Sequence, residues 1–496
     1  MYKIGNLSRW NNSYFIFALT LSVFSVVAIY NVVQWEIAKE KIPTMHSLDL
    51  ITGDEPHNLS ITSEIIRHHN VYMEEYFNDE PHDPSLIWPS DYYNNTLLWQ
   101  SYQRPDGHYI NVHPNGLPLL LIPGYAIGGI LGSMITMSVM SSLTSVFIYK
   151  FTRKLTTPKT GFFTTLLVSF STLLFTYSNQ IYADVVITLF LIASLYFILE
   201  KHRNGLHMAA VGVILGYGIF LKISFILIDV ILIPLIFIMF FKHQISLKNF
   251  SLFCIVFALF VTLSIVNNMY TNNSVIGGAQ TTSVINIFFT GKDQTGIFGA
   301  GAKIFGLTSI IESFFGKYHG MFIFSPILML STIGIKPLWD KNKQLVIIIT
   351  LLSISIITGY TLTDPENILF AGDPPSRYFV PLIPLMGIAV ACGFEKFSRR
   401  ISYRILLIIL TALSSAFSLA FAYNRIFSVD HALIKGKLVH LIYFNTDFFF
   451  PSLGTSIKYP MHHPLDIYNE IFLVSIVSLL VLGIMLPFLF EKKVIR

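Results

Sequence analysis

The feature that most limits how this chain can fold is a series of about twelve apolar runs, each able to cross the ~30 Å hydrocarbon core of a bilayer as a helix. Hydrophobic residues make up 53% of the 496 residues and charged residues only 12%, whereas soluble chains carry about a quarter charged residues. The runs fall roughly at 14–34, 131–149, 160–178, 183–199, 206–221, 223–241, 249–266, 320–335, 344–361, 378–394, 404–423 and 470–490. We therefore expect an all-α polytopic membrane protein, and a soluble globular chain is excluded.

Basic residues are distributed unevenly among the segments that join these runs. If Lys3 and Arg9 lie in the cytoplasm, the segments on that side hold twenty of the 33 basic residues but only four of the 28 acidic ones. Basic residues gather on the cytoplasmic side of membrane proteins, so both termini are expected there. The run 14–34 lacks a small-residue cleavage site and is expected to remain as an anchor. The formal charge of +5 thus reflects orientation in the cell membrane, and no nucleic-acid partner is expected.

We expect one membrane-embedded domain over residues 1–496, with two long extracytoplasmic segments. The first segment, 35–116, is rich in Asp, Asn, His, Tyr and Pro and holds seven of the fifteen histidines. Within it, residues 59–66 have helical spacing, which predicts short helices on the membrane surface. The second segment is the last outer loop, residues 425–469. These polar segments are where the sequence offers room for a site outside the membrane.

Asp54 and Glu55 follow the first apolar run and open the polar segment. A carboxylate can take a proton from a hydroxyl nucleophile, so the pair is a candidate general base. The alternative is an ordinary helix start, with Asp54 as the cap and Glu55 in the first turn. The two acids and a histidine could also hold a divalent metal ion. Cys254 and Cys392 lie inside apolar runs, so neither a disulfide nor a cysteine-based zinc site is expected.

Four more charged residues interrupt or border the apolar runs. Asp184 lies at the outer end of one run, Lys222 marks an outer turn within a long apolar stretch, and Arg377 begins another run, where its guanidinium could hold a phosphate. Asp229 lies within the bilayer, where a charge is costly and usually functional. It follows Lys222 by seven residues, so a purely structural pair between these two is an equal alternative.

The segment 113–124 returns the chain to the membrane with Pro118 and Pro123 inside an apolar run. Irregular backbone at membrane depth persists only where protein or a water-filled cavity satisfies its polar groups. This segment therefore predicts a cavity near the outer face.

Taken in order, these motifs resemble those of the GT-C superfamily of integral-membrane glycosyltransferases. The nearest branch is the prokaryotic one related to protein O-mannosyltransferases and aminoarabinose transferases, and the resemblance extends from about residue 12 to 395. The motifs are Gly-Asp-Glu-Pro after the first run, Pro-x-Gly-Leu-Pro-Leu-Leu from Pro114, Tyr-x-Asp from Tyr182, the Lys222 turn, Gly-Met-Phe-Ile-Phe-Ser-Pro from Gly320, and Ser-Arg-Tyr-Phe-Val-Pro-Leu-Ile-Pro from Ser376.

The resemblance implies a transferase that passes a sugar from a polyprenyl-phosphate carrier to a lipid-linked, glycan or protein acceptor on the outer face. No cofactor is required, and membrane lipids surround the protein. The implied catalytic residues are Asp54 as the general base, Glu55 and Asp184. The implied ligands of the donor phosphate are Lys222, Arg377, His113 and His319. Two positions depart from the family pattern, because His113 stands where relatives often have Lys and Pro375-Ser376 where they often have Gly-Pro.

A polyprenyl phosphate is a good leaving group that mainly needs its charge neutralised, whereas the acceptor hydroxyl needs a base. One base and one cationic clamp imply a single displacement with inversion at the anomeric carbon. The alternative class is a transporter or lipid flippase, since many membrane spans with buried charge and proline-broken helices also describe carriers. The absence of an obvious internal repeat and the size of the outer loops favour the transferase.

Overall fold

The computed structural model describes residues 7–41, 51, 54–74, 101–201, 203–275, 310, 313–315, 320–363 and 377–423. Within these residues, six helices are long and apolar enough to cross a membrane: Asn12–Ile37, Gly116–Leu155, Ile223–Phe241, Leu247–Asn272, Lys343–Thr361 and Ile401–Leu419. Two shorter apolar helices are Ala183–Ile198 and Gly205–Leu221. The expected class, a helical polytopic membrane protein, is confirmed, but the count of about twelve spans is not. The run 470–490, the loop 425–469 and His319 lie outside the described residues.

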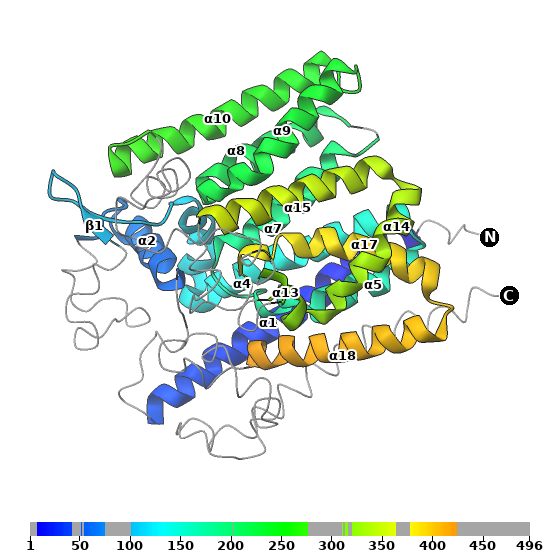
Figure 1. Ribbon diagram of the computed structural model, residues 1–496. Helices are drawn as coiled ribbons and strands as arrows, with labels where there is room; N and C mark the ends of the chain where they lie inside the picture. The colour runs from blue at the N-terminus through cyan, green and yellow to red at the C-terminus, as the bar shows by residue number, and fades with distance from the viewer. Residues whose placement is uncertain are drawn as a thin grey trace.

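Over the described part of the chain, the elements form a helical bundle with one small hairpin (Figure 1). The helices are α1 (Leu7–Lys41), α2 (Glu55–Arg67), α4 (Gly116–Leu155), α5 (Pro158–Phe170), α6 (Leu173–Thr176), α7 (Ala183–Ile198), α8 (Gly205–Leu221), α9 (Ile226–Phe241), α10 (Leu247–Asn272), α13 (Met321–Phe324), α14 (Leu330–Lys341), α15 (Lys343–Thr363), α17 (Leu382–Phe397) and α18 (Ile401–Tyr423). Short 3₁₀ helices are η5 (Ile223–Phe225), η6 (Pro326–Met329) and η7 (Arg377–Phe379). The antiparallel strands β1 (Ser101–Gln103) and β2 (Tyr109–Asn111) pair Tyr102 with Ile110.

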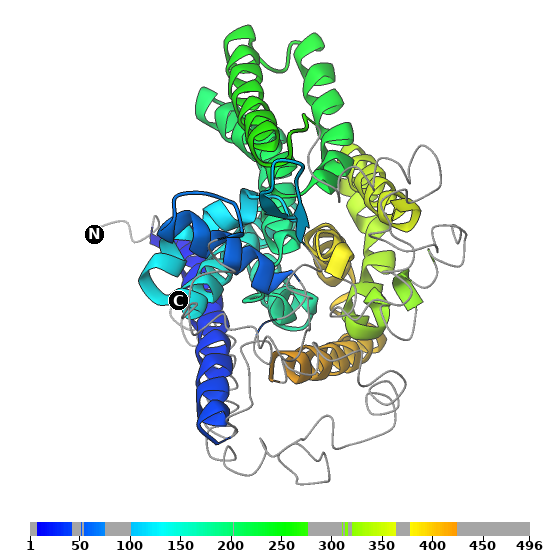
Figure 2. The same cartoon turned by 90° about the vertical axis from the view of Figure 1, so that its left-hand side faces the viewer.

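The helices pack mainly on neighbours in the chain: α1 on α4, α4 on α5 and α7, α7 on α8, and α8 on α10. Later helices close the bundle, with α14 on α17, α17 on α5, and α15 on α9. In the end-on view of Figure 2, α8, α9 and α10 stand at one edge, while α1 and α18 lie at the opposite edge. The hairpin and α2 lie at one end of the bundle, away from the N-terminal end of α1 (Figure 1).

Two of the expected spans are interrupted. The run 160–178 divides because α5 ends at Phe170 and Thr172 starts the four-residue α6, its hydroxyl accepting the amide of Leu174 at 3.2 Å. The run 320–335 divides after α13, where Pro326 opens η6. Proline has no N–H to donate to the preceding turn, and a capping hydroxyl satisfies the amides of a new one. Hydropathy therefore overestimated the length of continuous helix at both places.

The predicted irregularity after residue 113 is present, but it is not at the prolines. Pro118 is the third residue of α4, where backbone N–H groups have no intrahelical partner, and Pro123 lies inside the helix. The break falls at Gly128–Gly129, and Gly129 has φ 55° and ψ −132°, a conformation that glycine adopts readily. A Cβ at Gly132 would lie 1.9 Å from the carbonyl oxygen of Gly124, so the two arms of α4 touch through backbone atoms.

The segment 59–66 is helical, as its spacing predicts, and forms most of α2. However, every residue from Glu55 to Glu64 is buried, and α2 packs on α4. Over these residues α2 is therefore covered by protein. At the other end of the first polar segment, the expected loop 35–116 begins as helix, because α1 continues through Lys41.

The start of α4 packs directly against the end of α8. A Cβ on Gly116 would lie 2.5 Å from the carbonyl oxygen of Phe220, so only glycine allows this approach. The hydroxyl of Tyr217 donates to the carbonyl of Gly116 at 2.8 Å. Gly116 lies three residues after His113, and Phe220 lies two residues before Lys222, so this contact connects two parts of the predicted site.

Helices α8 and α10 form a close pair at the edge of the bundle (Figure 2). A Cβ on Gly212 would lie 2.9 Å from the carbonyl oxygen of Phe253, and one on Gly216 would lie 2.9 Å from that of Phe257. Most of α10 is not buried by the protein, and its exposed side chains include Ile255, Leu259 and Leu263. Small residues at a helix interface and apolar ones outside it are typical of membrane helices that face lipid.

Candidate active site

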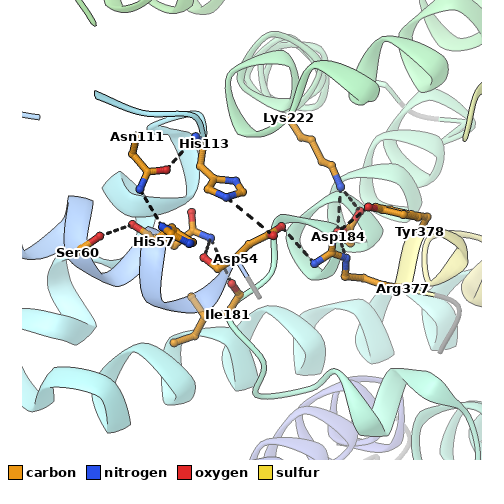
Figure 3. A network of polar contacts seen from close by, with 11 residues as sticks. Asp54, His57, Ser60, Asn111, His113, Ile181, Asp184, Lys222, Arg377 and Tyr378 are labelled. Carbon is orange, nitrogen blue, oxygen red and sulfur yellow. Dashed lines mark hydrogen bonds and ion pairs between the residues drawn. The ribbon is translucent and has the colours of Figure 1, made fainter. Parts of the chain in front are cut away.

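Four charged residues from separate parts of the chain converge near the start of α2 (Figure 3). Asp54 precedes α2, Asp184 is in the first turn of α7, Lys222 lies between α8 and η5, and Arg377 begins η7. We call these residues the charge cluster. Asp184 and Arg377 are buried, and Asp54 and Lys222 are partly buried. Charges shielded from water are costly unless they neutralise one another, and two acids with two bases do so.

Asp54 does not act as a helix cap in the structure. It precedes α2 with φ −77° and ψ −10°, and its side chain makes no capping hydrogen bond. Instead its Oδ2 lies 3.2 Å from Nη1 of Arg377, and its Oδ1 lies 3.9 Å from Nε2 of His113. Enclosure by the protein raises the pKa of Asp54, but Arg377, His113 and Lys222 outweigh that effect and hold the pKa below its usual range.

Glu55 is fully buried, and its carboxylate accepts the backbone N–H of Ile181 at 2.7 Å. The amide of Asn58 donates to the carbonyl of Asp54 at 2.8 Å and to that of Ile181 at 3.5 Å. The contacts of Glu55 and Asn58 with Ile181 tie the first turn of α2 to the segment just before α7, the helix that carries Asp184. Glu55 thereby helps to set the distance between the two acids of the charge cluster.

Asp184 is held by Lys222, whose Nζ donates to both carboxylate oxygens at 3.1 and 3.2 Å. Nε of Arg377 lies 3.7 Å from the same carboxylate. Burial lowers the pKa of Lys222, but Asp184 and then Tyr360 outweigh it and raise the pKa above its ordinary value. The partner of Lys222 is thus Asp184, and the alternative pairing with Asp229 is wrong. Asp229 is 3% exposed, and its carboxylate makes no hydrogen bond to any residue that the structure describes.

Three tyrosines line the cationic side of the cluster, and sequence reasoning gave none of them a role. The Arg377 guanidinium carbon lies 4.6 Å from the ring centre of Tyr182 and 4.9 Å from that of Tyr378. Nζ of Lys222 lies 4.6 Å from the ring centre of Tyr378, which stacks on Tyr360 with centres 4.7 Å apart. Tyr182 and Tyr378 were findable, because one lies two residues before Asp184 and the other directly after Arg377.

A second polar group borders Asp54 on its other side, formed by His57, Asn111 and His113 (Figure 3). The side-chain amide of Asn111 lies 3.1 Å from Nδ1 of His57, and its carbonyl oxygen accepts the backbone N–H of His113 at 3.0 Å. The two imidazole rings are 5.3 Å apart, centre to centre. Burial and then His113 lower the pKa of His57 to about 3, so His57 is neutral near pH 7.

The arrangement places the carboxylate of Asp54 beside cations that could also bind a second anion. Among the described residues, no group of three or more His, Cys, Asp or Glu side chains is placed to hold a metal ion. The structure brings six of the seven predicted site residues into one region: Asp54, Glu55, His113, Asp184, Lys222 and Arg377. The seventh, His319, lies outside the described part of the chain.

Part of the chain matches a known protein family. Residues 117–267 match the family described as dolichyl-phosphate-mannose-protein mannosyltransferase. The match runs from α4 to α10 and includes Asp184 and Lys222. Over these residues the chain is similar to that family, which agrees with the resemblance of its motifs to protein O-mannosyltransferases. No curated protein shows a significant sequence match to the chain.

Solved structures similar to this chain include ArnT from Cupriavidus metallidurans in the apo state, at 15% identity and a TM-score of 0.46. The same protein bound to undecaprenyl phosphate gives 14% identity and a TM-score of 0.44. Both comparisons cover 92% of this chain and 76% of ArnT. The Archaeoglobus fulgidus oligosaccharyltransferase in the apo form gives 12% identity and a TM-score of 0.44, over 83% of this chain and 56% of that one.

Proposed function

We propose that the protein transfers a sugar from a polyprenyl-phosphate donor to a hydroxyl group of an extracytoplasmic acceptor, with inversion at the anomeric carbon. The observation that carries this proposal is the charge cluster, in which the carboxylate of Asp54 lies 3.2 Å from the buried guanidinium of Arg377, with the partly buried Lys222 nearby. The matched family is named for a polyprenyl-phosphate sugar, dolichyl-phosphate-mannose, which supports the choice of donor.

Lys222 and Arg377 are proposed to hold the donor phosphate. As the sugar leaves, the phosphate oxygen gains negative charge, and two fixed cations stabilise that charge without having to rearrange. Arg377 is suited to this task because its planar guanidinium can bind two phosphate oxygens together. In the structure the guanidinium of Arg377 pairs with Asp54 and Asp184. A bound phosphate would therefore replace Asp54 as the partner of the N–H groups that now face this carboxylate.

Asp54 is proposed to be the general base for the acceptor hydroxyl. It precedes its helix without capping it and stays ionised at neutral pH, so it can accept a proton. The hydroxyl oxygen attacks the anomeric carbon while the bond to the phosphate breaks. One displacement of this kind needs no covalent enzyme intermediate, so the product has the inverted configuration.

Asp184 and Glu55 are proposed to support this arrangement. Asp184 holds Lys222 through two hydrogen bonds, and Glu55 holds the segment that carries Asp184. We propose that the reaction needs no cofactor, which can be tested for divalent ions by measuring transfer after treatment with EDTA. The acceptor is a lipid-linked glycan, a free glycan or a protein. The site is proposed to face the outside of the cell membrane, with both termini in the cytoplasm.

The proposal is tested with purified protein in vesicles and a panel of undecaprenyl-phosphate-linked mannose, glucose and aminoarabinose. Mass analysis of glycolipids and glycoproteins should show one added sugar and release of undecaprenyl phosphate. The matched control is the Asp54→Asn protein, which should bind undecaprenyl phosphate without transferring. Failure of the unmodified protein either to bind undecaprenyl phosphate or to use any donor would contradict the proposed function.

A further inference from the structure

Asn111 joins two buried histidines on the side of Asp54 that does not face the cations (Figure 3). Its carbonyl oxygen accepts a backbone N–H, that of His113, which settles the orientation of the side chain. The amide nitrogen must therefore be the atom that faces Nδ1 of His57 at 3.1 Å, and it donates to that nitrogen. This places the proton of His57 on Nε2 and keeps the ring neutral.

The two oxygens of Asp54 face different partners. Oδ2 faces Nη1 of Arg377 at 3.2 Å, whereas Oδ1 faces Nε2 of His113 at 3.9 Å. A separation of 3.9 Å is too long for a direct hydrogen bond, but a hydroxyl or water oxygen beside the two atoms can bond to both. Asp54 thus lies between a cation and an imidazole, and the imidazole side is the one where a proton can move.

We propose that His113 is a proton relay, which receives from Asp54 the proton taken from the acceptor hydroxyl, and that Asn111 and His57 are positioning residues for it. This inference rests on the proposed transferase function and assigns His113 a role other than phosphate binding.

In the proposed step the proton of the acceptor hydroxyl passes to Oδ1 of Asp54. A water oxygen that bridges the 3.9 Å gap then carries a proton to the lone pair on Nε2 of His113, whose neutral ring holds its own proton on Nδ1. The hydroxyl oxygen forms a bond to the anomeric carbon, and the bond from that carbon to the phosphate oxygen breaks with its electron pair on the phosphate. Lys222 and Arg377 hold the resulting charge, and His113 returns its proton to solvent after the products leave.

Proton transfer to His113 is favoured because Asp54 is a weak final acceptor. Its pKa is held below the usual carboxylate range, whereas His113 is an imidazole. The charged and titratable groups around His113 are Asp54, Arg377, Lys222 and His57. Burial lowers the pKa of His113, Asp54 opposes this, and the two cations add to it, so His113 is neutral at pH 7 and ready to accept. Because His57 stays neutral, it adds no repulsion when His113 becomes charged.

The test compares His113→Gln, which keeps a polar side chain but cannot titrate, with His113→Lys, which restores a cation. His108→Gln is the control, because His108 lies in the same hairpin but pairs with Glu74. For each protein, binding of undecaprenyl phosphate and the dependence of kcat on pH are measured with the panel donor that the unmodified protein uses. A relay predicts that kcat of the unmodified protein falls on the acid side, with a midpoint below pH 6.5, the ordinary value for histidine.

In both His113 variants we expect kcat to drop by roughly 10²-fold or more, undecaprenyl phosphate binding to persist, and the acid limb to move to lower pH or vanish. The His108→Gln protein should behave like the unmodified one. Restored binding and turnover in His113→Lys after both are lost in His113→Gln would show a phosphate ligand and overturn the relay. A pH-independent kcat of the unmodified protein between about pH 4 and 8 would overturn it without any variant, even if the variants fail to fold. Loss of all donor use by the unmodified protein would instead reject the proposed function.

Discussion

The charge cluster and the α8–α10 pair are held together in opposite ways. In the cluster, side chains from four separate segments meet through opposite charges, such as Lys222 and Asp184 at 3.1 Å. In the α8–α10 pair, Gly212 and Gly216 remove side-chain volume so that two backbones can approach. The cluster is therefore sensitive to charge and proton state, whereas the pair is sensitive to volume and indifferent to pH. The two regions meet at Lys222, which directly follows the C-terminal residue of α8.

The largest difference is expected for Asp54→Asn. Asn is similar in shape but cannot take the proton of the acceptor, so turnover should fall by roughly 10²–10⁴-fold while undecaprenyl phosphate still binds. Stability should also fall, because the variant removes the negative charge that lies 3.2 Å from the buried guanidinium of Arg377, so retained binding of undecaprenyl phosphate serves as the check on folding. Glu55→Gln is the matched comparison and should be milder, since its carbonyl oxygen can still accept the amide of Ile181. Near-normal transfer by the Asp54→Asn protein would contradict its role as base.

A second prediction concerns the cations. Lys222→Ala and Arg377→Ala should each weaken binding of undecaprenyl phosphate by about 1–3 kcal/mol, because a charge-assisted contact is lost. Titration of the purified variants with this lipid measures the change. Lys336→Ala serves as the control, since that lysine is 74% exposed and pairs with Asp340. Unchanged affinity in both site variants would remove the phosphate clamp.

Acid should weaken the site region more than the helix pair. The pKa of His57 is about 3 in the folded protein against 6.5 for an ordinary histidine, so the unfolded chain binds the extra proton first as the pH falls. Stability is therefore full above pH 6.5 and decreases below it, by about 2 kcal/mol at a pH near 5. Thermal unfolding of the unmodified and His57→Gln proteins measures this effect. Equal acid sensitivity of the two proteins would argue against a neutral, buried His57.

The smallest effect is expected from added volume between α8 and α10. A Cβ on Gly216 would lie 2.8 Å from Cβ of Phe260, so Gly216→Ala must push the helices apart and should cost about 1 kcal/mol at any pH. At Gly205 the nearest atom is a side-chain methyl at 3.3 Å, which makes Gly205→Ala the control. Melting temperatures in detergent measure both. If the difference in melting temperature between Gly216→Ala and the unmodified protein changes with pH, the distinction between the two regions is wrong.

The charged members of the site were predictable from the sequence because charge is scarce in this chain. An apolar bundle accommodates Asp184, Lys222 and Arg377 only if they meet one another, so each isolated charge pointed to the same place. The partner of Lys222 was less certain, since spacing also suggested Asp229. That spacing rule applies to one continuous helix, and Lys222 lies at the turn between two, with φ −165° and ψ 130°.

Other features depend on contacts between segments that no local pattern shows. The role of Asn111 follows from its placement between His57 and His113, which are far apart in sequence from one another. The break of α4 at Gly128–Gly129 likewise could be located only in the structure. Prolines are the stronger helix breakers, but α4 contains both Pro118 and Pro123 without breaking at either. A proline in the first turn of a helix costs little stability. The positive φ of 55° at Gly129, by contrast, is a property of the folded backbone that the sequence does not specify.

The contact between Gly116 and Phe220 has a consequence for how the site can vary. It joins the chain just after His113 to the chain just before Lys222 through backbone atoms and the 2.8 Å bond from Tyr217. The interval between His113 and Lys222 is therefore independent of which side chains occupy those two positions. Substitutions within the charge cluster can accumulate around a constant spacing, whereas a single methyl group at position 116 would alter that spacing whatever the cluster binds.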